Sequence, residues 1–220
     1  MKTMKALRLV MAATLWATLA TLGTGTAWAG GLDSLDAFVK NVKSGRASFT
    51  QTVTAPAKDG QVSLPKVSGG SFEFARPNRF KFVYKKPFEQ SIVADGQTLW
   101  LYDVDLAQVT ARKQAAALGS TPAALIAAAP DLKALQAEYE LSDAPSADGQ
   151  EWLKATPRSK DGSLQSVRVG FKGGVLATLE ILDSFGQRSV LQFSAFEVNA
   201  ALDASAFAFK PPAGVDVVRQ

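Results

Sequence analysis

Side chains of alternating polarity recur along this chain in short runs, and this pattern limits the possible folds more than any other feature of the sequence. Two runs are especially regular, because in 71–75 and 79–84 every second residue is Phe or Tyr. Strands bury every second side chain, so each run predicts a strand. The same reasoning predicts strands at 46–54, 90–95, 98–103, 107–110, 138–142, 150–156, 164–172, 175–183 and 188–199.

Turn residues separate these runs, as at Gly173-Gly174 and at Ser184-Phe185-Gly186, where hairpins are expected. About ten or eleven short strands, mostly joined by hairpins, predict one large antiparallel sheet. A sheet of that size has to curl or close. The predicted class is therefore mainly β with some α.

Two segments have helical rather than alternating spacing. Near the start, apolar residues recur every three or four positions, and Gly45 is placed to end that helix. Thr121-Pro122 then has the form of a helix start and opens an alanine-rich segment that contains Leu125 and Ile126. Pro130 stops this segment, and Asp131 can cap a further helix. We expect these helices to cover the concave face of the sheet.

The first 29 residues have the form of a secretory signal peptide. Lys2, Lys5 and Arg8 precede an apolar stretch, and Ala27-Trp28-Ala29 matches the small-residue pattern of a cleavage site. An uncleaved anchor is the alternative, but the apolar stretch, about 9–22, is shorter than the ~20 residues that a spanning helix needs. We expect cleavage after Ala29, residence in the periplasm, and one domain over 30–220.

Composition excludes several functions. The chain has no Cys, which rules out disulfides and a cysteine-linked lipid, and no His, which rules out the usual catalytic triads and zinc sites. Of 24 basic and 20 acidic residues, three basic ones lie in the signal, which leaves 21 against 20. A nearly neutral chain without a basic block predicts no nucleic-acid partner. No phosphate-binding or dinucleotide motif is present, and we expect no metal and no cofactor.

Carboxylates leave a hydrolase open as an alternative. Asp95, Asp103 and Asp105 are close in sequence, and two carboxylates can hydrolyse glycosides. All three stand where turns between strands are expected, and Asp favours turns for its own hydrogen bonds. Ser159-Lys160 is a weaker candidate in a predicted loop. The expectation is that the protein is not an enzyme.

Aromatic residues are the positive evidence for a function in this sequence, because they follow one another along the faces of the predicted strands. They can form the core of a sheet under helices or, since the alanine-rich segment offers little volume, line a ligand cavity. The residues concerned are Phe72, Phe74, Phe80, Phe82, Tyr84 and Trp100.

Five short motifs occur in an order that resembles the family of outer-membrane lipoprotein carrier proteins, the LolA family. They are Ser48–Gln51, Arg76-Pro77-Asn78-Arg79-Phe80, Asp95–Trp100 with Tyr102, Thr121-Pro122, and Phe207–Pro212 with Gly214 and Val215. The resemblance covers essentially the whole chain after the signal.

That resemblance implies an unclosed antiparallel half-barrel with a helical lid over a hydrophobic cavity. It implies acylated lipoproteins as cargo, received from an inner-membrane ABC-type lipoprotein-releasing complex and delivered to an outer-membrane receptor. Arg76 would hydrogen-bond the lid as a latch, and the six aromatic residues with Leu125 and Ile126 would line the acyl-chain cavity. The alternative is a periplasmic lipid-binding or envelope-stress-sensing module of the same fold. In either case we expect a monomer.

Overall fold

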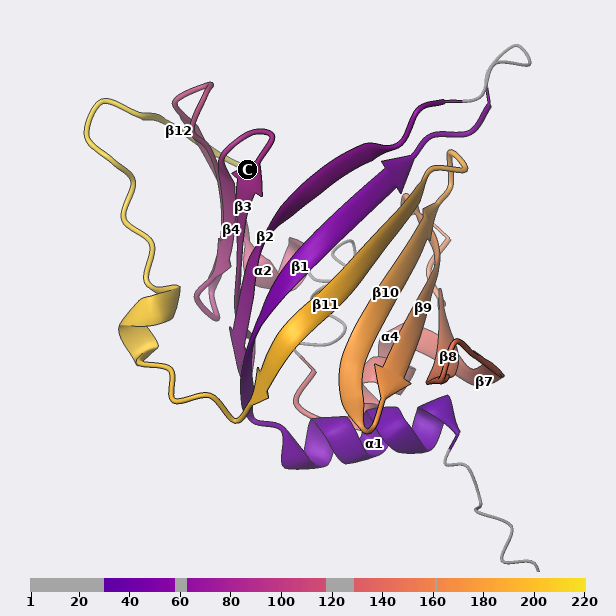
Figure 1. The fold of residues 1–220 in the computed structure, drawn as a ribbon. Coiled ribbons are helices and arrows are strands. Elements are labelled where there is room, and N and C mark those ends of the chain that lie inside the picture. The colour runs from indigo at the N-terminus through magenta and orange to yellow at the C-terminus, as the bar shows by residue number, and fades with distance from the viewer. Residues whose placement is uncertain (1–29, 58–62, 118–128, 161) are drawn as a thin grey trace, which may run out of the picture.

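A single curved sheet dominates the protein (Figure 1). The computed structural model describes residues 30–57, 63–117, 129–160 and 162–220, and within them twelve strands pair in the order β12-β6-β5-β4-β3-β2-β1-β11-β10-β9-β8-β7. Strands β12 and β7 are the two edges and do not pair with each other, so the sheet is an unclosed half-barrel, as predicted. The strand bounds are β1 Ser44–Thr54, β2 Lys66–Ala75, β3 Arg79–Lys86, β4 Gln90–Ala94, β5 Thr98–Asp103, β6 Gln108–Lys113, β7 Tyr139–Ala147, β8 Gln150–Pro157, β9 Leu164–Lys172, β10 Val175–Asp183, β11 Arg188–Val198 and β12 Asp216–Arg219.

All eleven predicted strands are present, and the predicted ends of β5, β9 and β10 are correct to the residue. The strand that the sequence did not reveal is β12. It pairs with β6 in parallel, whereas every other neighbouring pair is antiparallel, so the predicted antiparallel sheet is confirmed except at this one edge. β12 has four exposed residues and no alternating pattern, which explains why it was missed.

The N-terminal helix α1 covers Gly31–Asn41 and ends at Val42, whose backbone is extended. The prediction that Gly45 ends this helix is wrong, since Gly45 lies inside β1. A Cβ atom at Gly45 would lie 2.5 Å from the ring of Phe74 and 2.9 Å from that of Phe196. Glycine is therefore required there because two aromatic rings pack directly on the backbone.

The central segment is described only in part. Helix α2 spans Gln114–Ala117, and helix α4 spans Leu132–Glu138. The Asp131 carboxylate accepts a hydrogen bond from Ala134 N at 2.9 Å, which confirms the predicted cap. The predicted helix start at Thr121-Pro122, and with it Leu125 and Ile126, lies outside the described residues.

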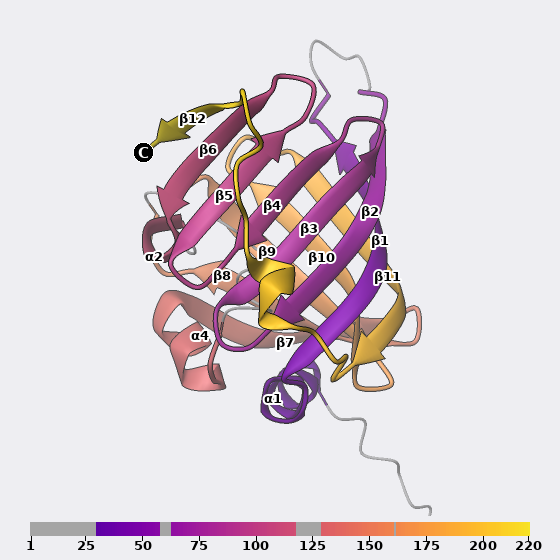
Figure 2. The same cartoon turned by 90° about the vertical axis from the view of Figure 1, so that its left-hand side faces the viewer.

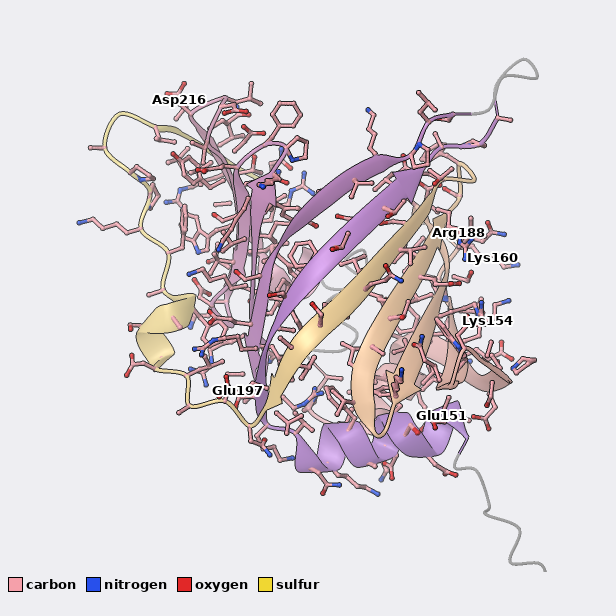
Figure 3. The ribbon with its side chains drawn as sticks, in the orientation of Figure 1. Glu151, Lys154, Lys160, Arg188, Glu197 and Asp216 are labelled. Atoms are coloured by element: carbon pink, nitrogen blue, oxygen red, sulfur yellow. The ribbon has the colours of Figure 1, made fainter. Side chains whose placement is uncertain are left out.

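The concave face of the sheet carries the main core. Helix α1 buries Leu35, Phe38 and Val39 against it, and α1 contacts β7 to β10 at the lower end of the sheet in Figure 1. The outer face carries charged side chains, among them Lys154, Arg188 and Glu197 (Figure 3). This difference between the faces directs any apolar ligand to the concave side.

A second, smaller core lies on the outer face. The C-terminal segment leaves β11, forms the short helix η2 (Ala204–Phe207) and crosses the outside of the sheet toward β12 (Figure 2). Phe207 is buried there, and the ring of Phe209 lies 5.4 Å from that of Trp100. Within the described residues, no helix is long and apolar enough to cross a membrane.

Candidate functional site

The aromatic residues of β2 and β3 meet on the concave face because of strand register. Phe74 pairs with Phe80 and Phe72 with Phe82, so all four side chains project from the same face. They are between 0 and 3% exposed. The ring centroids of Phe72 and Phe82 lie 4.5 Å apart, and those of Phe80 and Phe82 lie 6.3 Å apart. Four of the predicted cavity residues therefore form one closed aromatic layer.

Tyr84 continues this layer toward the open end of the sheet. Its ring centroid lies 5.0 Å from that of Phe49 on β1. Burial raises the pKa of Tyr84 to about 12. Tyr84 thus lies at the boundary between the aromatic layer and the solvent-accessible end.

Arg76, directly after β2, joins separate parts of the fold at the other end of the aromatic layer. Its Nε donates to the carbonyl oxygen of Val42 at 2.9 Å, and its Nη1 donates to that of Ala129 at 2.8 Å. Val42 is the end of α1, and Ala129 is the last residue of the alanine-rich segment and the one residue of it that the structure describes. The guanidinium carbon also lies 5.7 Å from the Phe38 ring centroid and 5.4 Å from that of Phe74.

Burial of Arg76 has a cost, because no carboxylate among the described residues pairs with it. Desolvation lowers the pKa of the guanidinium from 12.5 to about 10. Its Nη2 atom is buried and has no hydrogen-bond partner within the described part of the chain. Within the described residues, two carbonyl oxygens thus satisfy only part of the hydrogen-bonding capacity of this buried guanidinium.

Trp100 requires a correction, because it lies on the other face of the sheet. Leu99 is 5% exposed within the concave core, so its neighbour Trp100 points outward, paired with Val93. On the outer face Trp100 packs against Phe209, and its Nε1 donates to Asp95 Oδ2 at 2.9 Å. Alternation alone does not say which face is concave, so we leave Trp100 out of the proposed cavity.

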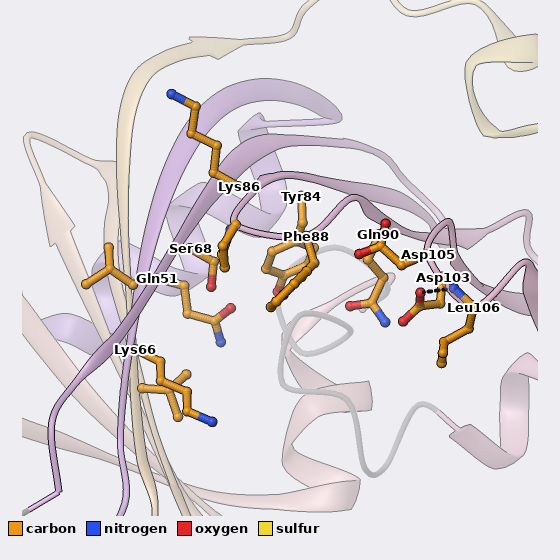
Figure 4. Close-up of a pocket in the computed structure, with 13 residues that line it drawn as sticks. Gln51, Lys66, Ser68, Tyr84, Lys86, Phe88, Gln90, Asp103, Asp105 and Leu106 are labelled. Atoms are coloured by element: carbon orange, nitrogen blue, oxygen red, sulfur yellow. Dashed lines mark hydrogen bonds between the residues drawn. The ribbon is translucent and has the colours of Figure 1, made fainter.

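A pocket of about 620 Å³ opens on the concave side at the mouth, by which we mean the end of the sheet where residues 86–90, 103–108 and 183–188 turn (Figure 4). Of the predicted cavity residues, Tyr84 lines it. Exposed apolar side chains stand at the same end, namely Phe88, Leu106 and Phe185. Within the described residues the aromatic layer is packed shut, and open space lies beside it at the mouth.

Of the carboxylates considered for a hydrolase, Asp95 lies apart from the other two, whereas Asp103 and Asp105 both line the mouth pocket. Asp95 precedes β5 and Asp103 ends it, so the two lie at opposite ends of that strand. Burial alone would raise the pKa of Asp95, but hydrogen bonds donated by Thr98 N, Trp100 Nε1 and Gln97 N lower it. Asp103 Oδ1 accepts from Leu106 N at 3.0 Å. Both carboxylates thus stabilise turns, as Asp commonly does. No group of three or more possible metal ligands occurs in the described part.

Several features of the site escaped the sequence analysis. The acceptors of Arg76 are backbone carbonyls, for which a sequence carries no signal. Gln114, 2% exposed, accepts from Gly96 N at 2.9 Å and donates to Asn78 O at 2.6 Å, which ties α2 to the turns beside Arg76. Phe196 faces inward because Ala195, at φ 49°, bulges out of β11. An extra residue in an alternating run is the signal that could have revealed this bulge.

A curved, unclosed sheet with an aromatic concave face and helices packed on it is typical of β-rich proteins that bind apolar ligands. The family model of the outer membrane lipoprotein carrier protein LolA matches residues 40–210. The chain belongs to this family, which is a family of carriers and not of enzymes.

Individual relatives and one solved structure are similar to this chain to different degrees. The outer-membrane lipoprotein carrier protein of Albidiferax ferrireducens is 72% identical over 200 residues, which cover 89% of this chain and 94% of that protein. That of Methylibium petroleiphilum is 54% identical over 205 residues, which cover 93% and 97%. A LolA superfamily protein from Nitrosomonas europaea aligns with a TM-score of 0.45 at 13% identity over 82% of this chain and 98% of that chain.

Proposed function

We propose that this chain carries lipoproteins through the periplasm by holding their acyl chains against the aromatic concave face of its sheet. Membership of the lipoprotein carrier family supports this role. The observation that carries the mechanism is the aromatic layer of Phe72, Phe74, Phe80 and Phe82, closed at one end by Arg76. The proposed activity makes and breaks no covalent bond.

Uptake requires the concave face to open, because its aromatic rings are packed shut. Each CH₂ group moved out of water gains about 0.8 kcal/mol, so one buried chain of some fifteen carbons would gain on the order of 12 kcal/mol. A carrier that kept all of this energy could not release its cargo. The work of opening reduces the net affinity, and we propose that Arg76 sets this work through its bond to Ala129.

The direction of transport then depends on partners. We propose that the inner-membrane ABC-type lipoprotein-releasing complex supplies the cargo and that an outer-membrane receptor accepts it. The absence of a nucleotide motif from the sequence agrees with an energy source outside this chain. We also propose that the carrier acts as a monomer, which sedimentation of the free protein and of its cargo complex tests.

Export is the remaining part of the proposal. We propose cleavage after Ala29, which leaves Gly30 as the first residue. The fold supports this boundary, because a Cβ atom at Gly30 would lie 2.6 Å from Asp143 Oδ1, so residue 30 is already packed on the domain. The mass of the protein recovered from the periplasm tests the site, and a mass that includes the first 29 residues would contradict it.

Release of a radiolabelled triacylated lipoprotein from spheroplasts tests the carrier function directly. With the purified mature chain added, we expect a soluble complex of carrier and lipoprotein. Phe80→Glu should block the complex, because it places a charge in a fully buried position of the aromatic layer. Lys85→Glu, at an exposed position of the same strand, is the matched control and should not. Absence of release by the folded wild-type chain would refute the proposal.

A further inference from the structure

The concave face changes from apolar to polar in successive rows toward the mouth. One row, set by pairing across β1 to β5, is apolar and consists of Ala47, Phe72, Phe82, Ile92 and Leu101. The next row runs through Phe49, Gly70, Tyr84, Gln90 and Asp103. Beyond it, Gln51 pairs with Ser68. Side chains two residues apart on a strand share a face, so these rows form one continuous surface.

The polar rows line the mouth pocket, and several of their hydrogen-bonding groups are unused. Among the described residues, none hydrogen-bonds the side chains of Ser68 and Gln90 or the hydroxyl of Tyr84, and all three are partly buried. The amide of Gln51 donates to Ser189 Oγ at 2.6 Å, which leaves its carbonyl oxygen for another donor. Partly buried polar groups without protein partners are stabilised by water or by a polar ligand.

The charges around this pocket cancel. Lys66 and Lys86 stand at one side of the pocket, and Asp103 and Asp105 stand at the other, with the uncharged polar groups between them (Figure 4). An anionic headgroup would meet the aspartates, and a cationic one would meet the lysines. This arrangement favours a neutral ligand with hydrogen-bond donors and acceptors, such as amides and esters.

We propose that the mouth pocket binds the polar junction of the lipoprotein, that is, the glyceryl ester carbonyls and the first peptide amides at the acylated cysteine. The inference rests on the proposed function and adds a second ligand subsite to it. Tyr84 lines the pocket and touches the aromatic layer through Phe49, so acyl chains on that layer place the junction at the pocket. Ser68 and Gln90 supply hydrogen bonds to the junction, and the polypeptide leaves past the exposed Phe88.

Two ligands separate this subsite from the acyl-chain cavity. One is a tripalmitoylated S-glyceryl-cysteinyl peptide with neutral residues, and the other is palmitate, which has the chain and neither the glyceryl ester nor the peptide. The double variant Ser68→Ala/Gln90→Leu is compared with Gln192→Leu. This control repeats the glutamine-to-leucine substitution at an exposed position on the outer face of β11. Circular dichroism and thermal unfolding confirm that each variant is folded.

The measured quantity is the ratio of the two affinities. Loss of one or two hydrogen bonds is expected to weaken lipopeptide binding by the double variant about 5- to 30-fold relative to palmitate, and the ratio for Gln192→Leu should equal that of the wild type. An unchanged ratio in the double variant would overturn the inference and leave the carrier function intact. Failure of the wild-type chain to bind either ligand would instead overturn the proposed function and this inference with it.

Discussion

Replacing Arg76 with leucine tests whether a single side chain keeps the concave face closed. The bond from Nη1 to Ala129 O connects the sheet to the end of the alanine-rich segment. A hydrogen bond from a charged donor contributes about 1.5–3 kcal/mol. Loss of this bond should therefore raise the equilibrium constant for opening by about 10- to 150-fold.

Burial of the guanidinium works against this closure. A fall in the pKa of Arg76 from 12.5 to about 10 corresponds to a cost of at most about 3 kcal/mol for keeping the group charged in the folded protein. The two hydrogen bonds of Arg76 together contribute about 3–6 kcal/mol, so the net closure is weak. A weakly held latch is what a carrier needs if it has to open for each cargo.

Equilibrium binding of the triacylated lipopeptide, together with its transfer rate to acceptor liposomes, measures the effect. If opening limits binding, the apparent Kd of Arg76→Leu falls by up to the same factor of 10 to 150, and transfer slows. Arg79→Leu is the matched control, since Arg79 packs on Phe207 at the outer face. A folded Arg76→Leu variant whose Kd and transfer rate stay within about twofold of the wild type would refute the latch.

Two further predictions concern the packing of the fold. Gly31→Ala should lower the free energy of unfolding by about 1–3 kcal/mol in urea denaturation, because its Cβ atom would lie 2.2 Å from the carbonyl carbon and oxygen of Trp152. Gly162→Ala is the control, since the nearest atom to its Cβ would be 3.9 Å away. Equal stabilities of the two variants would contradict the expected clash. Burial raises the pKa of Tyr84 to about 12, so the folded protein binds more protons than the unfolded chain between about pH 10 and 12, and stability should fall with rising pH across this window. Comparison of wild type with Tyr84→Phe by denaturation at pH 9 and pH 11.5 measures this contribution, and an identical pH dependence in both would show that Tyr84 has no part in it.

Local patterns in the sequence predicted most of the strands of the sheet. Every second residue of β2 and β3 is aromatic, and alternation between neighbouring side chains is a property of the strand itself, so both strands were predicted before any contact was known. The absence of Cys and His from the sequence likewise excluded whole classes of chemistry. The basic residues and apolar stretch at the N-terminus predicted export in the same local way.

Long-range contacts decided the rest. Alternation separates Leu99 from Trp100 but does not say which of them faces the core. The burial of Leu99 in the concave core and the packing of Phe209 on Trp100 show that Trp100 lies outside. Strand β12 has no alternating pattern and exists because β6 offers it an edge. The carbonyl of Ala129 becomes the acceptor of Arg76 only because folding brings together two residues far apart in the chain. Sequence alone thus determined eleven of the twelve strands in the described residues. The tertiary structure determined β12, the face that each side chain occupies and what it contacts, because these depend on residues distant in sequence.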